Sequence, residues 1–196
     1  LLQWRWSDPW LRFALELAAA LLRYFEDTDR GGFFFTAHDH EQLIQRRKDF
    51  MDDAVPSGNA TAASALLTLG HLVGDEDFVG AAERTQRAAG GSLQRIPHAH
   101  GALLCSMMDL MDPPLQIILR GPDAEITRWQ RYCADILPLR ARLFAIPDGA
   151  GPLPGLLAER RAAGAAVAYV CEGFACDAPI ADLDALLVRI RARPGA

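Results

Sequence analysis

The stretch Arg46–Leu67, RRKDFMDDAVPSGNATAASALL, decides the fold that we predict for this chain. It begins with charged residues, breaks at Pro56, and continues with small residues and leucines. Ser57 is a favourable helix N-cap, and Gly74 is a favourable residue just past a helix end. Small side chains on one face allow neighbouring helices to approach closely. We therefore predict an inner helix between these two residues, packed against several others.

Further helices are predicted on both sides of this one. Asp8 and Pro9 form a helix start, and apolar residues then recur at three- and four-residue spacing to about Asp27. Asp75 begins another helix, and one more follows Pro97. Because the connections are short, consecutive helices should be antiparallel neighbours, and the chain before about residue 111 should be essentially helical.

The sequence pattern changes after two consecutive prolines, Pro113 and Pro114. Short apolar runs rich in β-branched residues then alternate with helical segments, the first of which covers Asp123–Ile136. Parallel strands need a connection of this length, so we predict one small parallel sheet from three strands, Leu115–Leu119, Arg142–Ile146 and Val167–Cys171. The predicted domains are helical hairpins over residues 1–112 and a small α/β segment over residues 113–196 packed on them.

Length, charge and hydropathy exclude several classes of protein. The 196 residues are enough for one domain with a core, with or without a small appendage. The net charge is -5 and the basic residues are dispersed, so neither nucleic acid nor an anionic membrane is an expected partner. The apolar runs are far shorter than the roughly 20 residues that cross a bilayer, and no signal sequence opens the chain. We therefore predict a soluble, cytoplasmic protein.

The spacing of the four cysteines does not indicate a disulfide framework. They contain no CxxC pair and lack the density of a small secreted scaffold. We therefore predict four reduced thiols, at Cys105, Cys133, Cys171 and Cys176. The alternative is a bridge between the last two, which a tight turn in the sequence CEGFAC would bring together.

Two motifs carry a resemblance to a known family. They are GGFFFTAHDHEQLIQRRKDFMDDAVPSGNATAASALLTLGHLVGDEDF at residues 31–78 and AYVCEGFACDAPI at residues 168–180. Both resemble the carboxy-terminal part of the YyaL-like family of spermatogenesis-associated thioredoxin-domain proteins. Members have an amino-terminal thioredoxin-like domain followed by an α/α toroid similar to six-hairpin glycosidases and sugar epimerases. The resemblance implies a mainly α fold, a fragment of such a toroid, whose partner would be the amino-terminal remainder of a longer chain.

The resemblance is most specific in two groups of residues, Lys48, Asp49, Asp53, Ala54, Pro56, Ser57, Gly58 and Asn59, and then Cys171, Phe174, Cys176 and Pro179. It departs at Phe35, where the family tends to carry Asp before the Thr, and at Asp52–Asp53, where Asp-Gly is usual. The first departure removes a carboxylate from the loop. The resemblance therefore indicates the fold more firmly than the chemistry.

The charged half of the opening stretch is the predicted site. In a toroid, inner helices aim their amino-terminal ends at a funnel, where free backbone N–H groups and the positive dipole end favour anionic or hydroxyl-rich ligands. Two carboxylates there would serve glycoside chemistry, and we assign catalysis to Asp53, as base or nucleophile, and to Asp49. The residues predicted to bind a carbohydrate or sugar phosphate are Ser57, Asn59, Lys48 and Asp39.

Structural roles also explain these residues. Ser57 can act as a helix cap and nothing more, and the acids can be solvated or paired with Arg46, Arg47 and Lys48. The tryptophans near the start of the chain have the same two interpretations, because they can stack on a sugar ring or anchor a helix to its neighbour.

Neither a metal nor a cofactor is predicted. His38 and His40 are two residues apart, as are His98 and His100, and neither pair has the spacing that zinc sites favour.

Two hypotheses about function remain. One is a carbohydrate-active toroid enzyme of the hydrolase or epimerase kind, and the other is a noncatalytic scaffold or ligand-binding portion of a redox-associated protein. Convergence of Asp49, Asp53 and Asn59 on an open cavity would favour the enzyme. Pairing and capping of the same residues in a filled loop would favour the scaffold.

Overall fold

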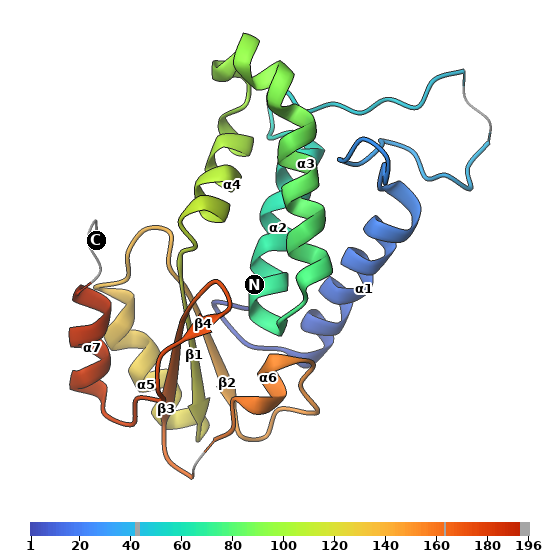
Figure 1. The fold of residues 1–196 in the computed structure, drawn as a ribbon. Coiled ribbons are helices and arrows are strands. Elements are labelled where there is room, and N and C mark those ends of the chain that lie inside the picture. Colours follow the sequence, from blue (N-terminus) through green and yellow to red (C-terminus); the bar gives the residue numbers. More distant parts are fainter. Residues whose placement is uncertain (42–43, 163, 193–196) are drawn as a thin grey trace. The chain divides into compact units, whose positions relative to one another are not determined.

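The fold is that of a computed structural model, which describes residues 1–41, 44–162 and 164–192 (Figure 1). The chain forms two compact units. One unit is Phe13–Pro113, and the other combines Leu1–Arg12 with Pro114–Ala196. About half of the chain is helical. None of the helices in the described ranges is long and apolar enough to cross a membrane.

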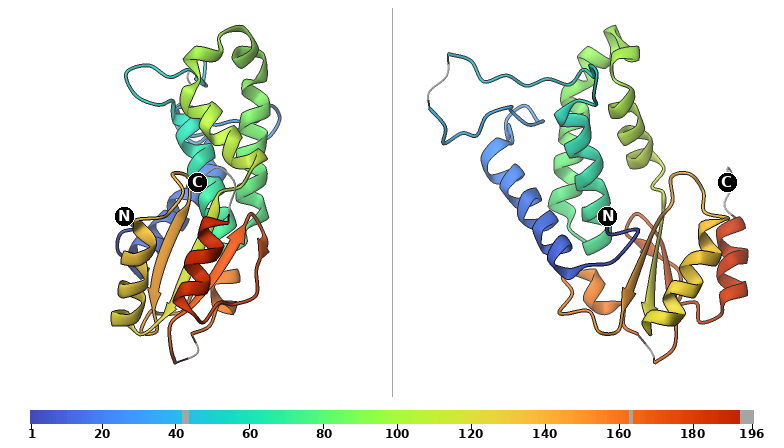
Figure 2. Two further views of the ribbon diagram at one scale, coloured as in Figure 1. Left: turned by 90° about the vertical axis from the view of Figure 1, so that its left-hand side faces the viewer. Right: turned by 180° about the vertical axis from the view of Figure 1, so that it is seen from behind.

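The unit Phe13–Pro113 is built from helices. They are α1 (Asp8–Phe25) from Phe13 onward, α2 (Gly58–Val73), α3 (Glu76–Arg95), the short 3₁₀ helix η1 (Pro97–Ala99) and α4 (Gly101–Met111). Helix α2 contacts α3 and α4, and its Leu66 and Leu67 share an apolar cluster with Ala18 of α1. The views agree that α2 and α3 lie between α1 and α4 (Figures 1 and 2). The predicted inner helix is therefore confirmed, whereas closure into a toroid stays a prediction.

Side-chain caps set the ends of these helices where the sequence predicts them. The Ser57 hydroxyl accepts a hydrogen bond from the Ala60 N–H at 3.2 Å and so caps α2. Gly74 ends this helix in the left-handed conformation, with φ of 79°. Asp75 caps α3 by accepting the Phe78 N–H at 3.1 Å. None of the described residues in 26–57 is helical, so the prediction of an essentially helical chain before residue 111 is wrong for this segment.

The other unit contains a four-stranded sheet in the order β2-β1-β3-β4. Its elements are β1 (Leu115–Gly121), α5 (Asp123–Ala134), β2 (Arg142–Pro147), α6 (Leu156–Glu159), β3 (Val167–Glu172), β4 (Ala175–Cys176) and α7 (Leu183–Arg191). The three predicted strands are confirmed in position. Strand β1 pairs with β2 in parallel, with Gln116 opposite Arg142, because α5 forms the expected crossover.

The prediction of a wholly parallel sheet is wrong for the third strand. Strand β3 runs antiparallel to β1, with Leu115 opposite Glu172, so the sheet is mixed. The described part of the connection from β2 to β3 contains only the four-residue helix α6. A segment of this kind does not supply the crossover helix that carries a chain back across a sheet.

One face of the sheet carries the core of this unit. Alternate residues of β1, such as Ile117 and Leu119, pack with Trp129 of α5 and Ile190 of α7. Figure 2 shows α5 and α7 on the same side of the sheet. All seven residues of β1 are buried, which explains why most of its sequence, LQIILRG, is apolar.

Cys171 and Cys176 form a disulfide, so the prediction of four reduced thiols is wrong. The two residues are directly paired across the β3–β4 hairpin, and opposite positions of such a pair bring the side chains together. Gly173 makes the turn possible with φ of 60°. Cys133 is a free thiol, and burial raises its pKa to about 11, which keeps it protonated.

Candidate functional site

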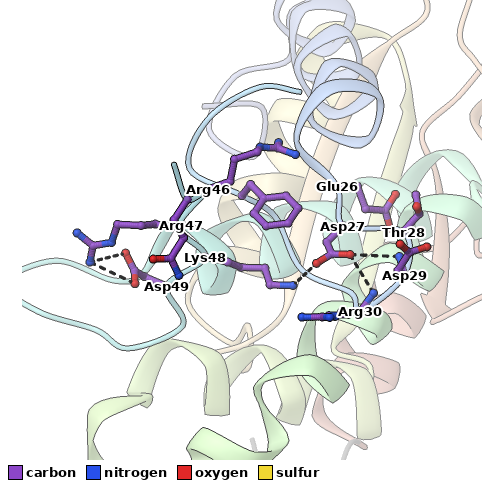
Figure 3. Close-up of a pocket in the computed structure, with 11 residues that line it drawn as sticks. Glu26, Asp27, Thr28, Asp29, Arg30, Arg46, Arg47, Lys48 and Asp49 are labelled. Carbon is purple, nitrogen blue, oxygen red and sulfur yellow. Dashed lines mark hydrogen bonds and ion pairs between the residues drawn. The ribbon is translucent and has the colours of Figure 1, made fainter. Parts of the chain in front are cut away.

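A charged cavity of about 740 Å³ is the candidate site in the helical unit (Figure 3). It lies between the segments Glu26–Arg30 and Gln45–Asp49, and Phe34 also lines it. The lining contains acidic and basic side chains in equal number, namely Glu26, Asp27, Asp29 and Asp49 against Arg30, Arg46, Arg47 and Lys48. Two residues of the predicted site, Lys48 and Asp49, are therefore part of this cavity.

Two glycines turn the chain from α1 into the cavity wall. Gly31 and Gly32 have φ of 75° and 78°, a region that side chains disfavour. A Cβ on Gly31 would lie 2.4 Å from the carbonyl oxygen of Arg84, and one on Gly32 would lie 2.9 Å from the ring of Phe50. The backbone of this turn is thus closely packed, and it fixes the first wall of the cavity.

A partly buried ion pair joins the two walls. Lys48 Nζ donates to Asp27 Oδ2 at 2.6 Å and to the Gly31 carbonyl oxygen at 2.7 Å, as the close-up shows for the carboxylate (Figure 3). Burial raises the pKa of Asp27, but the hydrogen bonds from Lys48 and from the backbone N–H groups of Arg30 and Asp29, with the Lys48 charge, outweigh it. The pKa of Asp27 therefore lies below its ordinary value, and the carboxylate is held ionised.

Two more carboxylates of the lining are paired. Arg84 donates to Glu26 Oε1 from Nε at 2.9 Å and from Nη2 at 2.6 Å, and the Glu26 side chain is only 7% exposed. Arg47 Nη2 lies 3.2 Å from Asp49 Oδ2, but here both side chains are mostly exposed. Exposed pairs of this kind contribute about 0–1 kcal/mol. Asp49 is therefore the more available carboxylate of the two.

Arg46 and Arg30, two basic residues of the lining, differ in their contacts. Arg46 Nη2 donates to the Thr36 carbonyl oxygen at 2.5 Å, and its guanidinium lies over the Phe34 ring, 4.0 Å from the centroid. The Nε of Arg46 is buried and has no hydrogen-bond partner in the described residues. The Arg30 guanidinium pairs with no described residue. The Arg30 guanidinium thus remains for a ligand, whereas Arg46 is held by Thr36 and Phe34 and its Nε is enclosed.

Asn59, in the first turn of α2, binds the backbone of the irregular segment that precedes this helix. Its Oδ1 accepts the Phe33 N–H at 2.7 Å, and its Nδ2 donates to the carbonyl oxygens of Phe33 at 3.0 Å and Asp49 at 2.9 Å. Asn59 also lines a smaller cavity of about 190 Å³, together with Asp49 and Gly58. Because both of its N–H groups are already donated to backbone, this side chain acts as an anchor of the loop.

Asp52, which the sequence predicts to line the approach to the site together with Asp49 and Asp53, connects two helix starts. Its Oδ1 accepts the Ser57 N–H at 2.9 Å, and its Oδ2 accepts the Ala102 N–H in the first turn of α4 at 2.8 Å. The hydrogen bond from Ala102, then that from Ser57, lowers the pKa of Asp52; burial opposes this and the charge of His100 adds to it. An Asp shortly before a helix cap was the available signal, but its second partner lies 50 residues away.

The remaining predicted residues lie outside both cavities. Asp53 is exposed, and the contact described for it is a hydrogen bond from its backbone N–H to the Val55 carbonyl oxygen at 3.1 Å. Asp39 is exposed as well, and Ser57 is the buried cap of α2. Lys48, Asp49 and Asn59 are thus the predicted residues that the fold brings to a cavity, while Asp53 does not line the one that Asn59 lines.

The other unit has a cavity of its own, of about 570 Å³. Trp4 and Trp6 line it together with Asp123 and Gln130. Trp6 Nε1 donates to Asp8 Oδ1 at 2.7 Å, whereas Trp4 is 83% exposed. Within the described ranges, no group of three or more His, Cys, Asp or Glu side chains is arranged to hold a metal ion.

Comparisons with known proteins identify relatives that are much longer than this chain. It is 30% identical over 184 residues to spermatogenesis-associated protein 20 of Homo sapiens, and 29% identical to the proteins of that name from Rattus norvegicus and Mus musculus. The human match covers 90% of this chain but 23% of the relative. No protein-family model matches the chain. The similarity supports a relationship to these proteins over the matched segment, while the toroid and the thioredoxin-like domain stay predictions.

Proposed function

We propose that this chain provides a noncatalytic ligand-binding portion, and that the charged cavity binds an anionic carbohydrate of the sugar phosphate class. The observation that carries the proposal is the balance of charge left after internal pairing. Asp27, Glu26 and Asp49 have basic partners at Lys48, Arg84 and Arg47. The charged lining residues without a described ionic partner are Arg30, Arg46 and Asp29. The net charge of these three side chains is positive.

The chemistry of the lining suits a phosphorylated sugar. Guanidinium groups bind phosphate oxygens through parallel N–H donors, which favours Arg30 as the phosphate ligand, while Arg46 adds positive charge to the lining. The Thr28 hydroxyl, the Gln45 amide and the Asp29 carboxylate supply donors and acceptors for sugar hydroxyls. A volume of about 740 Å³ falls within the range of small-molecule sites, roughly 300–1,000 Å³.

A noncatalytic role is favoured over glycoside hydrolysis by the state of the carboxylates. A general acid for that reaction needs a raised pKa, so that it still holds its proton near neutral pH. The pKa of Asp27, which lines the cavity, is shifted the other way, because burial is outweighed by hydrogen bonds that stabilise the charged form. Asp53, the residue assigned as base or nucleophile, does not line the charged cavity.

Isothermal titration calorimetry tests this proposal. Glucose 6-phosphate should bind the 196-residue chain more tightly than either glucose or inorganic phosphate does. The Arg30→Gln variant should bind it about tenfold more weakly, because a lost charge-assisted contact of about 1.4 kcal/mol corresponds to that factor. Arg95→Gln is the matched control, since it removes the same charge from an exposed position of the same unit that does not line the cavity.

Three results would contradict the proposal. Equal binding of inorganic phosphate and glucose 6-phosphate would indicate an anion site with no selectivity for carbohydrate. Equal loss of affinity in the Arg30 and Arg95 variants would place the ligand elsewhere. Hydrolysis or epimerisation of the sugar during the titration, seen by NMR of the recovered ligand, would restore the enzyme hypothesis.

A further inference from the structure

The disulfide of the β3–β4 hairpin lies against a buried arginine. Arg160, which follows α6, donates from Nη2 to Cys176 Sγ at 3.2 Å and to Cys171 Sγ at 3.4 Å. Arg160 is 5% exposed and Cys171 is 1% exposed, whereas Cys176 is exposed. Cys176 is therefore the more accessible of the two residues, and both sulfurs accept a hydrogen bond from one guanidinium.

The charge around the hairpin favours a thiolate. The two carboxylates next to the cysteines in sequence are Glu172 and Asp177, and both are paired with Arg189 of α7, at 3.1 Å and 2.7 Å. Arg189 thus largely offsets their negative charge, and the groups that interact electrostatically with the Arg160 guanidinium itself are Glu159 and Tyr169. A neighbouring guanidinium lowers the pKa of a cysteine, because it stabilises the thiolate over the thiol.

We propose that Cys171 and Cys176 form a redox-active pair that exchanges with dithiols, with Arg160 stabilising the thiolates that form. This activity is independent of ligand binding in the charged cavity, which belongs to the other unit. Cys133 is not expected to take part in such exchange, because burial raises the pKa of its thiol to about 11.

The exchange has two steps. A thiolate of the dithiol attacks Sγ of Cys176, the more accessible residue, a mixed disulfide forms, and the electron pair of the broken bond passes to Cys171 Sγ, beside Arg160. The second thiol of the reagent loses its proton and attacks the reagent's own sulfur in the mixed disulfide, which releases Cys176 as a thiolate. The reagent is oxidised to a disulfide, the protein pair is reduced, and the two protons lost by the reagent protonate the cysteines or enter solvent.

Reduction of the native chain by dithiothreitol is the first test. Alkylation followed by mass spectrometry should find Cys171 and Cys176 bridged in the chain equilibrated with oxidised glutathione, and free after equilibration with reduced dithiothreitol, without unfolding. A bridge that opens only in denaturant would overturn the proposal. So would a pair that stays reduced in oxidised glutathione.

The pH profile of Cys176 alkylation in the reduced chain is the second test, and it isolates the role of Arg160. The midpoint should lie at least about one pH unit below the ordinary thiol value of about 8.5. Arg160→Gln should raise the midpoint, and a rise of about one pH unit leaves roughly tenfold less thiolate at pH 7. Arg160→Lys should retain most of the effect, because the charge remains.

Arg161→Gln is the matched control, since Arg161 is exposed and is the next residue in the chain. It should leave the Cys176 profile within about 0.3 pH units of the wild type, as an exposed charge is well screened. A wild-type midpoint above about 7.5 would refute the proposal without any variant, so the test does not depend on whether Arg160→Gln folds. Equal changes of the midpoint in the Arg160 and Arg161 variants would refute the role of Arg160.

Discussion

Replacing Asp52 by Asn tests whether a single carboxylate holds two helix starts together. In the wild type, each carboxylate oxygen accepts one backbone N–H, from Ser57 at 2.9 Å and from Ala102 at 2.8 Å. An Asn side chain has the same shape but only one acceptor oxygen. Its NH₂ group must then face one of the two N–H donors, so one hydrogen bond is lost and the other loses its charge.

The expected cost follows from these two contacts. A hydrogen bond to a charged group contributes about 1.5–3 kcal/mol, and the lower end applies because Asp52 is only partly buried. The negative charge near the amino-terminal ends of α2 and α4 adds about 0.5 kcal/mol. We therefore expect Asp52→Asn to lower the free energy of unfolding of the helical unit by about 2 kcal/mol.

Urea denaturation followed by circular dichroism measures this change. All four tryptophans, Trp4, Trp6, Trp10 and Trp129, belong to the other unit, so their fluorescence reports on that unit separately. Asp53→Asn is a matched control, because it removes the same charge at the adjacent, exposed position and should change stability by less than about 0.5 kcal/mol. Equal effects of the two substitutions would refute the idea that Asp52 connects the helices.

The same carboxylate predicts a pH dependence. The pKa of Asp52 is lowered in the folded chain, so its contribution to stability is fully present above the unfolded value of about 3.9. That contribution is lost as the pH falls through the lower folded value. The difference in stability between wild type and Asp52→Asn should therefore shrink below about pH 4, and a difference that grows there would contradict the assignment.

Two further substitutions test the loop that forms the cavity wall. Asn59→Ala should lower the free energy of unfolding by about 3 kcal/mol, because the Phe33 N–H and carbonyl oxygen lose a buried partner, and an unchanged urea midpoint would contradict its role as an anchor. Gly31→Ala should cost more than about 2 kcal/mol, since its φ is positive and a Cβ would clash with the Arg84 carbonyl oxygen. Gly90→Ala, where nothing lies within 4 Å, should instead raise Tm in thermal circular dichroism, and a fall in Tm of equal size in both variants would exclude this explanation.

Local signals explain why the helix boundaries could be predicted from the sequence. The caps at Ser57 and Asp75 bind N–H groups three residues ahead, and Gly74 ends α2 through its own backbone conformation. Each of these interactions is complete within a few residues. Sequence patterns of that length therefore contain all the information that the cap requires.

Contacts between distant segments explain the errors. The direction of β3 depends on how the chain returns to the sheet, and the disulfide depends on a hairpin whose second strand has two residues. In the site, the two partners of the Asp52 carboxylate are 5 and 50 residues away, and Asn59 binds Phe33 across 26 residues. The sequence shows that these side chains are polar and suitably placed. It does not show which of the acids Asp49, Asp52 and Asp53 connects distant segments.

The charged and polar side chains of this loop resemble a catalytic site, but an irregular segment needs such side chains to bind its own backbone. Backbone groups outside helices and strands must find partners, and side chains supply them here: Lys48 for the Gly31 carbonyl oxygen, Arg46 for that of Thr36 and Asn59 for both groups of Phe33. A side chain whose donors are already committed in this way can reach a ligand only by giving up a buried contact. Among the basic side chains that line the charged cavity in the described residues, Arg30 is the one without such a contact, so the binding test uses Arg30 instead of Asn59.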